Sequence, residues 1–197
     1  DNSGVQKLSK ALANRFIHFY IDVDLDSWKS WALVNNINEK IIGFLTFKPD
    51  MLCKKPNIED NSYPTPRMWE YISRLLGFGL YDEDIIESAV GKGVASEFLS
   101  YLEVYNQLPD VDKILKGEKV SVPKELSVLY ALSSSLVIKS DKINIEHVFN
   151  YCDRMPKEFE ILTIRDIVRK DESVFNAYPK KKDWLDRHGK FFEYDNE

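Results

Sequence analysis

One apolar run constrains the fold more than any other stretch of this sequence. Residues 16–21 read Phe-Ile-His-Phe-Tyr-Ile, a nearly continuous series of aromatic and β-branched side chains that ends at Asp22. Such a run is typical of a strand buried on both faces. We find no convincing second strand, and a lone strand leaves two rows of backbone donors and acceptors unpaired. The sequence therefore predicts a strand whose neighbours lie outside this chain.

The rest of the chain has the periodicity of helices. Asp24 or Asp26 is expected to cap the first helix after the strand, and Gly43 inside the next one indicates a close helix contact. A long loop is expected between these helices and the next, which Thr65 begins. The expected helices are residues 5–13, 24–34, 37–47, 65–76, 82–90, 94–108, 125–139, 144–153 and 157–170. The predicted fold class is mainly α: a helical bundle, a helical C-terminal extension and one orphan strand.

Proline and glycine mark the best internal boundary. Residues 109–123 begin and end with proline and contain Gly117 with one short helical turn. We expect a division into residues 1–24, residues 25–108 and residues 109–197. In the last part, residues 176–183 are polar. The C-terminal tail after them is expected to pack against the rest of the protein, because it contains Trp184, Leu185, Phe191 and Phe192.

Composition excludes several classes of function. The formal charge of −5 argues against broad nucleic-acid binding, and the basic run of Lys180, Lys181 and Lys182 is by default a solvated surface. Cys53 and Cys152 are far apart and are expected to be plain thiols, and the three histidines are scattered, so a metal site has little support. No signal peptide or apolar run of membrane length is found, which predicts a cytosolic protein.

The stretch Pro64-Thr65-Pro66-Arg67 is expected to begin a helix and to present an arginine there. Thr65 can accept a hydrogen bond as the N-cap, and Pro66 suits the first helical position. Arg67 follows, although a cation in the first turn is opposed by the helix macrodipole. A nearby anion would remove that conflict. The alternative is a solvated arginine, or an ion pair with Glu70 three residues later.

Two motifs together resemble a known family. Ala11-Leu12-Ala13-Asn14-Arg15-Phe16 resembles the segment of AAA+ ATPases, in the MoxR and dynein-related branch, in which a helix ends in Asn-Arg-Phe and runs into the last strand of the ATPase core. Pro64-Thr65-Pro66-Arg67 resembles the sensor-2 motif that begins a lid helix in the same branch. The order of the two motifs, and their separation by two helices and a loop, agree with that family as well. The resemblance covers about residues 1 to 107 and is specific mainly at Arg15 and Arg67.

The resemblance implies a role for each arginine. Arg15 matches the finger that reaches the γ-phosphate of a neighbour's ATP across a ring, commonly a hexamer. Arg67 matches the sensor-2 arginine, which touches the phosphates bound in its own subunit. Residues 1–24 would be the end of the ATPase core, residues 25–108 the helical lid, and residues 109–197 a helical extension. ATP and Mg²⁺ would be bound by the parent protein, which would remodel a protein substrate or work with an adaptor.

The nucleotide-binding half of such a protein is not in this sequence. No Walker A or Walker B motif is present, so the chain alone is not expected to bind Mg-ATP tightly or to hydrolyse it. The resemblance implies that Asp1 lies just after the sensor-1 strand of a longer parent. The main alternative is a free-standing helical interaction module in which residues 16–21 are buried by the chain's own helices. A weaker one is a nucleic-acid-binding domain that uses Lys180 to Lys182.

Overall fold

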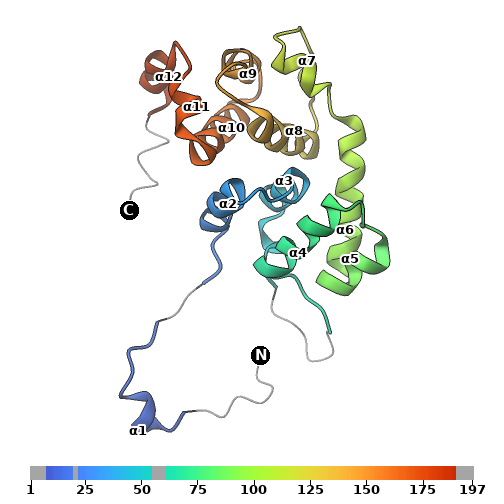
Figure 1. Cartoon of the computed structure of the whole chain (residues 1–197), viewed down its shortest axis with the longest axis vertical. Helices are drawn as coiled ribbons and strands as arrows, with labels where there is room; N and C mark the ends of the chain where they lie inside the picture. The colour runs from blue at the N-terminus through green and yellow to red at the C-terminus, as the bar shows by residue number, and fades with distance from the viewer. Residues whose placement is uncertain (1–7, 20–21, 55–60, 190–197) are drawn as a thin grey trace.

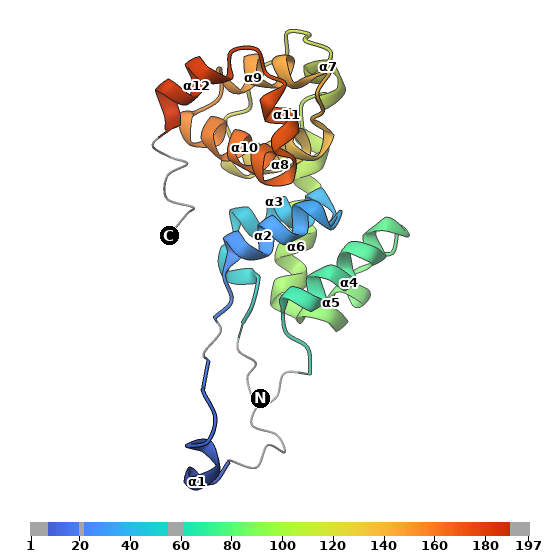
Figure 2. The same ribbon diagram turned by 60° about the vertical axis from the view of Figure 1, so that its left-hand side comes forward.

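The fold is mainly helical, as the sequence predicts. The computed structural model describes residues 8–19, 22–54 and 61–189, and these form twelve α-helices and two short 3-10 helices without any strand. Helices α2 and α3 lie between an upper group, α7 to α12, and a lower group, α4 to α6 (Figure 1). A view turned by 60° shows the same order and places α1 apart from the other helices (Figure 2).

Most helix bounds lie close to the expected ones, whereas the sequence pattern predicts no helix at α11 or α12. In chain order they are α1 (Lys10–Ala13), α2 (Leu25–Val34), α3 (Glu39–Phe47), η1 (Pro49–Met51), α4 (Pro66–Gly77), α5 (Glu83–Val90), α6 (Lys92–Val104), η2 (Tyr105–Gln107), α7 (Val111–Leu115), α8 (Leu126–Lys139), α9 (Ile145–Cys152), α10 (Lys157–Lys170), α11 (Glu172–Asn176) and α12 (Lys181–His188).

Side-chain caps set the starts of α2 and α3. The Asp24 carboxylate accepts a hydrogen bond from the Ser27 N–H at 2.7 Å, so Asp24, and not Asp26, caps α2. Hydrogen bonds from the side chain of Ser27 and from its backbone N–H lower the pKa of Asp24. Asn38 caps α3 by accepting a hydrogen bond from the Lys40 N–H at 3.0 Å. An unsatisfied N–H at each helix start is thereby paired.

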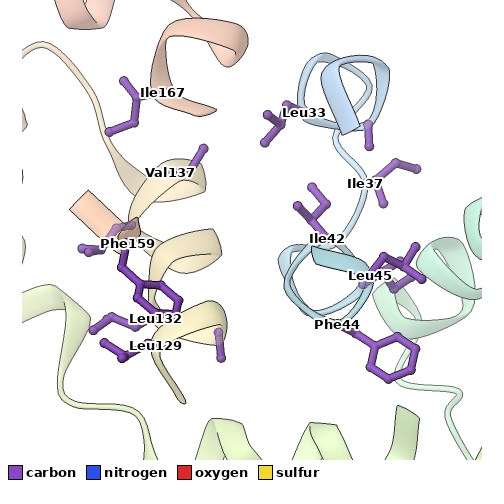
Figure 3. Packing of buried hydrophobic residues seen from close by; sticks show 14 of the residues in the cluster. Leu33, Ile37, Ile42, Phe44, Leu45, Leu129, Leu132, Val137, Phe159 and Ile167 are labelled. Atoms are coloured by element: carbon purple, nitrogen blue, oxygen red, sulfur yellow. The ribbon is translucent and has the colours of Figure 1, made fainter. Parts of the chain in front are cut away.

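One hydrophobic cluster joins the two halves of the chain. It runs from Trp28 in α2 to Trp184 in α12, and its most extensive helix pairing is between α3 and α8. Leu33 of α2 and Ile42 of α3 both point toward the labelled side chains of α8 (Figure 3). The core is therefore continuous across residue 108. The division into residues 25–108 and 109–197 stays a prediction.

Gly43 lies where α3 meets α6 and α8, as the sequence predicts. A Cβ at this position would lie 2.6 Å from the Tyr101 hydroxyl oxygen and 2.7 Å from Ser134 Oγ. Gly43→Ala is therefore expected to destabilise the fold by about 1–3 kcal/mol through overpacking, despite alanine's better helix propensity. Urea unfolding measures the loss. Gly93→Ala is the control, because a Cβ there meets nothing within 4 Å; equal stability changes in the two variants would contradict the contact.

The predicted strand is not formed by the residues that the structure describes. Residues 16–19 have no regular secondary structure, and Phe16, Ile17 and Phe19 are 58%, 83% and 82% exposed. Tyr20 and Ile21 lie outside the described residues. A strand needs a neighbour to pair its backbone groups, and the described residues contain none.

Two other predicted segments need correction. The helix expected over residues 94–108 ends as α-helix at Val104 and continues as η2. Within the polar residues 176–183, α11 ends and α12 begins. The first helix covers only Lys10–Ala13 among the described residues, and residues 5–7 lie outside them. Trp184 is buried, which agrees with a docked α12, whereas Phe191 and Phe192 lie outside the described residues.

Candidate functional site

The start of α4 has the local structure predicted for it. Thr65 has extended backbone angles, and its Oγ1 accepts a hydrogen bond from the Met68 N–H at 3.2 Å. Pro66 occupies the first helical position. Trp69 is fully buried and donates its ring N–H to the Met51 carbonyl at 2.9 Å. This anchor fixes the helix start against the loop before it.

Most backbone N–H groups at this helix start are already satisfied or absent. Pro66 has none, Met68 donates to Thr65 Oγ1, and Trp69 donates to the Thr65 carbonyl at 3.1 Å. The Arg67 N–H has no acceptor among the described residues. One backbone donor and one guanidinium from the same residue are therefore free to meet an anion at the positive end of the helix.

Arg67 is exposed and borders a surface hollow of about 550 Å³. Ser62, Thr65 and Ser88 also line this hollow. Among the described residues, Arg67 has no ion-pair partner, because Glu70 pairs instead with Arg74, one turn further along. The simple i, i+3 pair between Arg67 and Glu70 is therefore not formed.

Arg15 follows α1 directly. Its backbone N–H donates to the Leu12 carbonyl at 3.0 Å, which closes the last turn, and its side chain is exposed. Within the described part of the chain it has no ion-pair partner. Helix α1 lies well away from α4 in both views, so the structure does not bring Arg15 and Arg67 together (Figures 1 and 2).

The cap at Thr65 gives a direct test of how the helix start is held. Thr65→Ala removes the acceptor for the Met68 N–H and is expected to cost about 1 kcal/mol of stability. Thr65→Ser keeps the hydroxyl and should retain most of the stability that the cap contributes. Chemical denaturation of the two variants checks this, and an alanine variant as stable as the serine variant would contradict the capping role.

A second charged site, which the sequence did not reveal, lies between α2 and α10. Lys29 Nζ and the Asp166 carboxylate are 2.5 Å apart, and both side chains are almost fully buried. Arg169 donates to Asp26 Oδ1 at 2.7 Å. The sequence offers Asp26 as an alternative helix cap, but Asp24 caps α2 and Asp26 pairs with Arg169. Pairs this distant in sequence carry no periodic signal that could have identified them.

Two further titratable side chains, Cys152 and His188, are buried. Cys152 is fully buried, and burial raises the pKa of its thiol, which disfavours the thiolate. Burial and nearby Lys157 lower the pKa of His188. The described segments hold no group of three His, Cys, Asp or Glu side chains suited to a metal ion. Lys181 donates to the Asn176 side chain at 2.9 Å, so part of the predicted basic run closes the α11–α12 turn.

None of the described helices is both long and apolar enough to span a bilayer. Comparison with protein-family models, curated proteins and solved structures finds no match to this chain.

Proposed function

We propose that this chain is the C-terminal part of an AAA+ ATPase and supplies two arginines to ATP hydrolysis. Arg67 would act as the sensor-2 arginine, and Arg15 as the finger that reaches a neighbouring subunit. The observation that carries the proposal is the start of α4, where Arg67 is exposed beside a hollow and lacks an ionic partner among the described residues. A guanidinium in that position is unfavourable to the helix unless an anion joins it.

The chemistry of phosphoryl transfer explains why an arginine would be held there. Negative charge redistributes over the phosphate oxygens in the transition state, and a guanidinium offers them directed donors with a permanent charge. The Arg67 N–H would add a backbone donor at the helix start. Both contributions are electrostatic and need a rigid support, which the buried Trp69 gives to α4.

The exposed apolar segment supports the same proposal. Phe16, Ile17 and Phe19 have most of their surface in water. The alternative of a free-standing module expected this segment to be buried by the chain's own helices. Under our proposal, it packs as the last strand of the ATPase core, whose other strands would come from the parent protein. That core would hold ATP and Mg²⁺, since this sequence has no Walker motifs.

The resemblance further suggests how the parent would work. It would assemble as a ring, commonly a hexamer, and would use ATP hydrolysis to remodel a protein substrate. Residues 109–197 would then offer a helical surface to the substrate, the ring neighbour or an adaptor.

ATP turnover by the parent protein tests the role of Arg67. Arg67→Ala is expected to lower the turnover at least tenfold, because charge stabilisation worth more than about 1.4 kcal/mol is lost. Arg74→Ala is the matched control, because Arg74 lies on the same helix and pairs with Glu70. Equal turnover in the Arg67 variant and the wild type would remove the proposed role.

A helical interaction module remains the second candidate, and the continuous core from α2 to α12 favours it. Hydrogen exchange on the isolated chain separates the two functions. Strong amide protection over residues 16–21 would favour the module, whereas our proposal predicts fast exchange there until the ATPase core is supplied.

A further inference from the structure

A groove of about 390 Å³ opens among the start of α3, the end of α4 and the end of α6. We call it the α4–α6 groove, and it belongs to the lower group of helices (Figure 1). Its volume lies within the range of about 300–1,000 Å³ that is typical of ligand pockets. It shares no residue with the hollow beside Arg67. Leucine and tyrosine side chains form its apolar lining: Leu76, Tyr81, Leu99, Leu102 and Tyr105.

The loop that follows α4 exposes large apolar side chains at this groove. Phe78, Leu80 and Tyr81 are 80%, 44% and 51% exposed. The backbone of the loop is nevertheless held, because the Leu80 N–H donates to the Leu75 carbonyl at 2.9 Å around Gly79, whose φ is +74°. This is the hydrogen bond of a Schellman motif. The exposed side chains are therefore fixed in place before a partner arrives, which lowers the entropic cost of binding.

The charges that line the groove are mainly negative. Asp82 and Glu103 line it, and neither has an ion-pair partner among the described residues. Asp82 occupies the N-cap position of α5 without a capping hydrogen bond from its side chain, so its carboxylate is not committed to the helix. Lys40 is the single cation among the described residues of the lining, and its Nζ lies 5.5 Å from the centre of the Tyr105 ring. Two further exposed acids follow Asp82 in α5.

We propose that the α4–α6 groove binds a basic amphipathic segment of a partner protein. Apolar side chains of the segment contact Tyr81 and Leu102, and its lysine or arginine side chains pair with Asp82 and Glu103. The described residues contain no sheet edge to which an extended peptide could add, so the segment binds as a helix that lays its apolar face in the groove. Arg15 and Arg67 take no part, so the binding is independent of the proposed ATPase role.

Charge complementarity selects this partner over the alternatives. An acidic segment would place like charges opposite Asp82 and Glu103, which is costly across an interface. A second copy of the chain, bound through the same face in a symmetric dimer, would bring the same acids together. A basic segment instead offers both carboxylates an opposite charge while its apolar side chains cover the exposed loop after α4.

Two synthetic peptides, each titrated into the ¹⁵N-labelled full chain, test the proposal. The basic peptide is two repeats of Leu-Lys-Lys-Leu-Leu-Lys-Leu, and the acidic one is two repeats of Leu-Glu-Glu-Leu-Leu-Glu-Leu, so both have the same apolar face. We expect the basic peptide to shift the amide resonances of the loop after α4 and of the end of α6. The acidic peptide should bind at least about tenfold more weakly.

Variants of the groove show whether these residues make the contacts. Tyr81→Ala removes an exposed aromatic anchor and should weaken binding of the basic peptide about tenfold. Ile143→Ala is its control, because Ile143 is exposed and lies outside the groove. The double variant Asp82→Asn with Glu103→Gln should weaken binding roughly fivefold at low salt.

A second double variant, Glu146→Gln with Asp186→Asn, gives the same change of net charge at exposed acids outside the groove and should leave the affinity nearly unchanged. The proposal is overturned by equal affinity for the two peptides, by shifts that map outside the groove, or by no binding of the basic peptide. Equal losses in the two double variants would overturn it as well. So would groove shifts that depend on protein concentration without peptide, because a second copy would then be the occupant.

Discussion

Arg15→Ala is expected to lower ATP turnover of the parent ring by about 10³- to 10⁵-fold, the range known for arginine fingers that act in trans. The structure describes Arg15 just beyond α1, with an exposed side chain and no ion-pair partner in the described segments. Its removal should therefore leave the helical core intact. ATP binding should change little, because the proposed contact is made with the nucleotide of a neighbouring subunit.

Mixing experiments separate a finger that acts in trans from a residue needed for folding. Subunits with Arg15→Ala are combined with subunits whose Walker A lysine has been replaced. Each type is inactive in its own ring, but a mixed ring can pair an intact finger with an intact nucleotide site. Partial recovery of turnover is the expected result, whereas full turnover in rings made only of Arg15→Ala subunits would contradict the assignment.

The second large effect is expected at the buried ion pair between α2 and α10. Asp166→Ala leaves Lys29 charged and buried without its partner, which should cost about 3–5 kcal/mol of stability. Replacing both residues, as Lys29→Met with Asp166→Leu, should recover much of this loss because neither charge is then left buried. Urea denaturation of Lys29→Met, of Asp166→Leu and of the double variant measures the coupling.

An exposed pair supplies the control for this effect. Asp50 and Lys54 are 3.9 Å apart and well exposed, so Asp50→Ala should cost less than about 1 kcal/mol. A similarly small loss from Asp166→Ala would mean that the Lys29 ammonium reaches water readily, and would contradict its buried role.

Local features of the fold could be predicted because their causes are local. Thr65 and Pro66 mark a helix start by hydroxyl capping and fixed backbone geometry, and α10 has the predicted bounds, Lys157–Lys170. The close contact at Gly43 also followed from a glycine inside a helical pattern. In the candidate site, the sequence predicts the start of the helix and the presence of Arg67 in its first turn.

Features that depend on distant partners could not be predicted. Residues 16–19 have strand-forming side chains, but a strand forms only when another pairs with it. The Lys29–Asp166 pair joins α2 to α10, segments more than a hundred positions apart. Lys170 Nζ donates to the Val137 carbonyl of α8 at 2.9 Å, a contact between helices that the sequence pattern does not indicate.

The coding sequence immediately upstream of Asp1 tests the central claim most directly. The proposal predicts an open reading frame that continues upstream and encodes a Walker A motif, with its lysine on the order of a hundred residues before Asp1. An initiating methionine directly before Asp1 would contradict it, because no ATPase core would then precede Arg15 and Arg67.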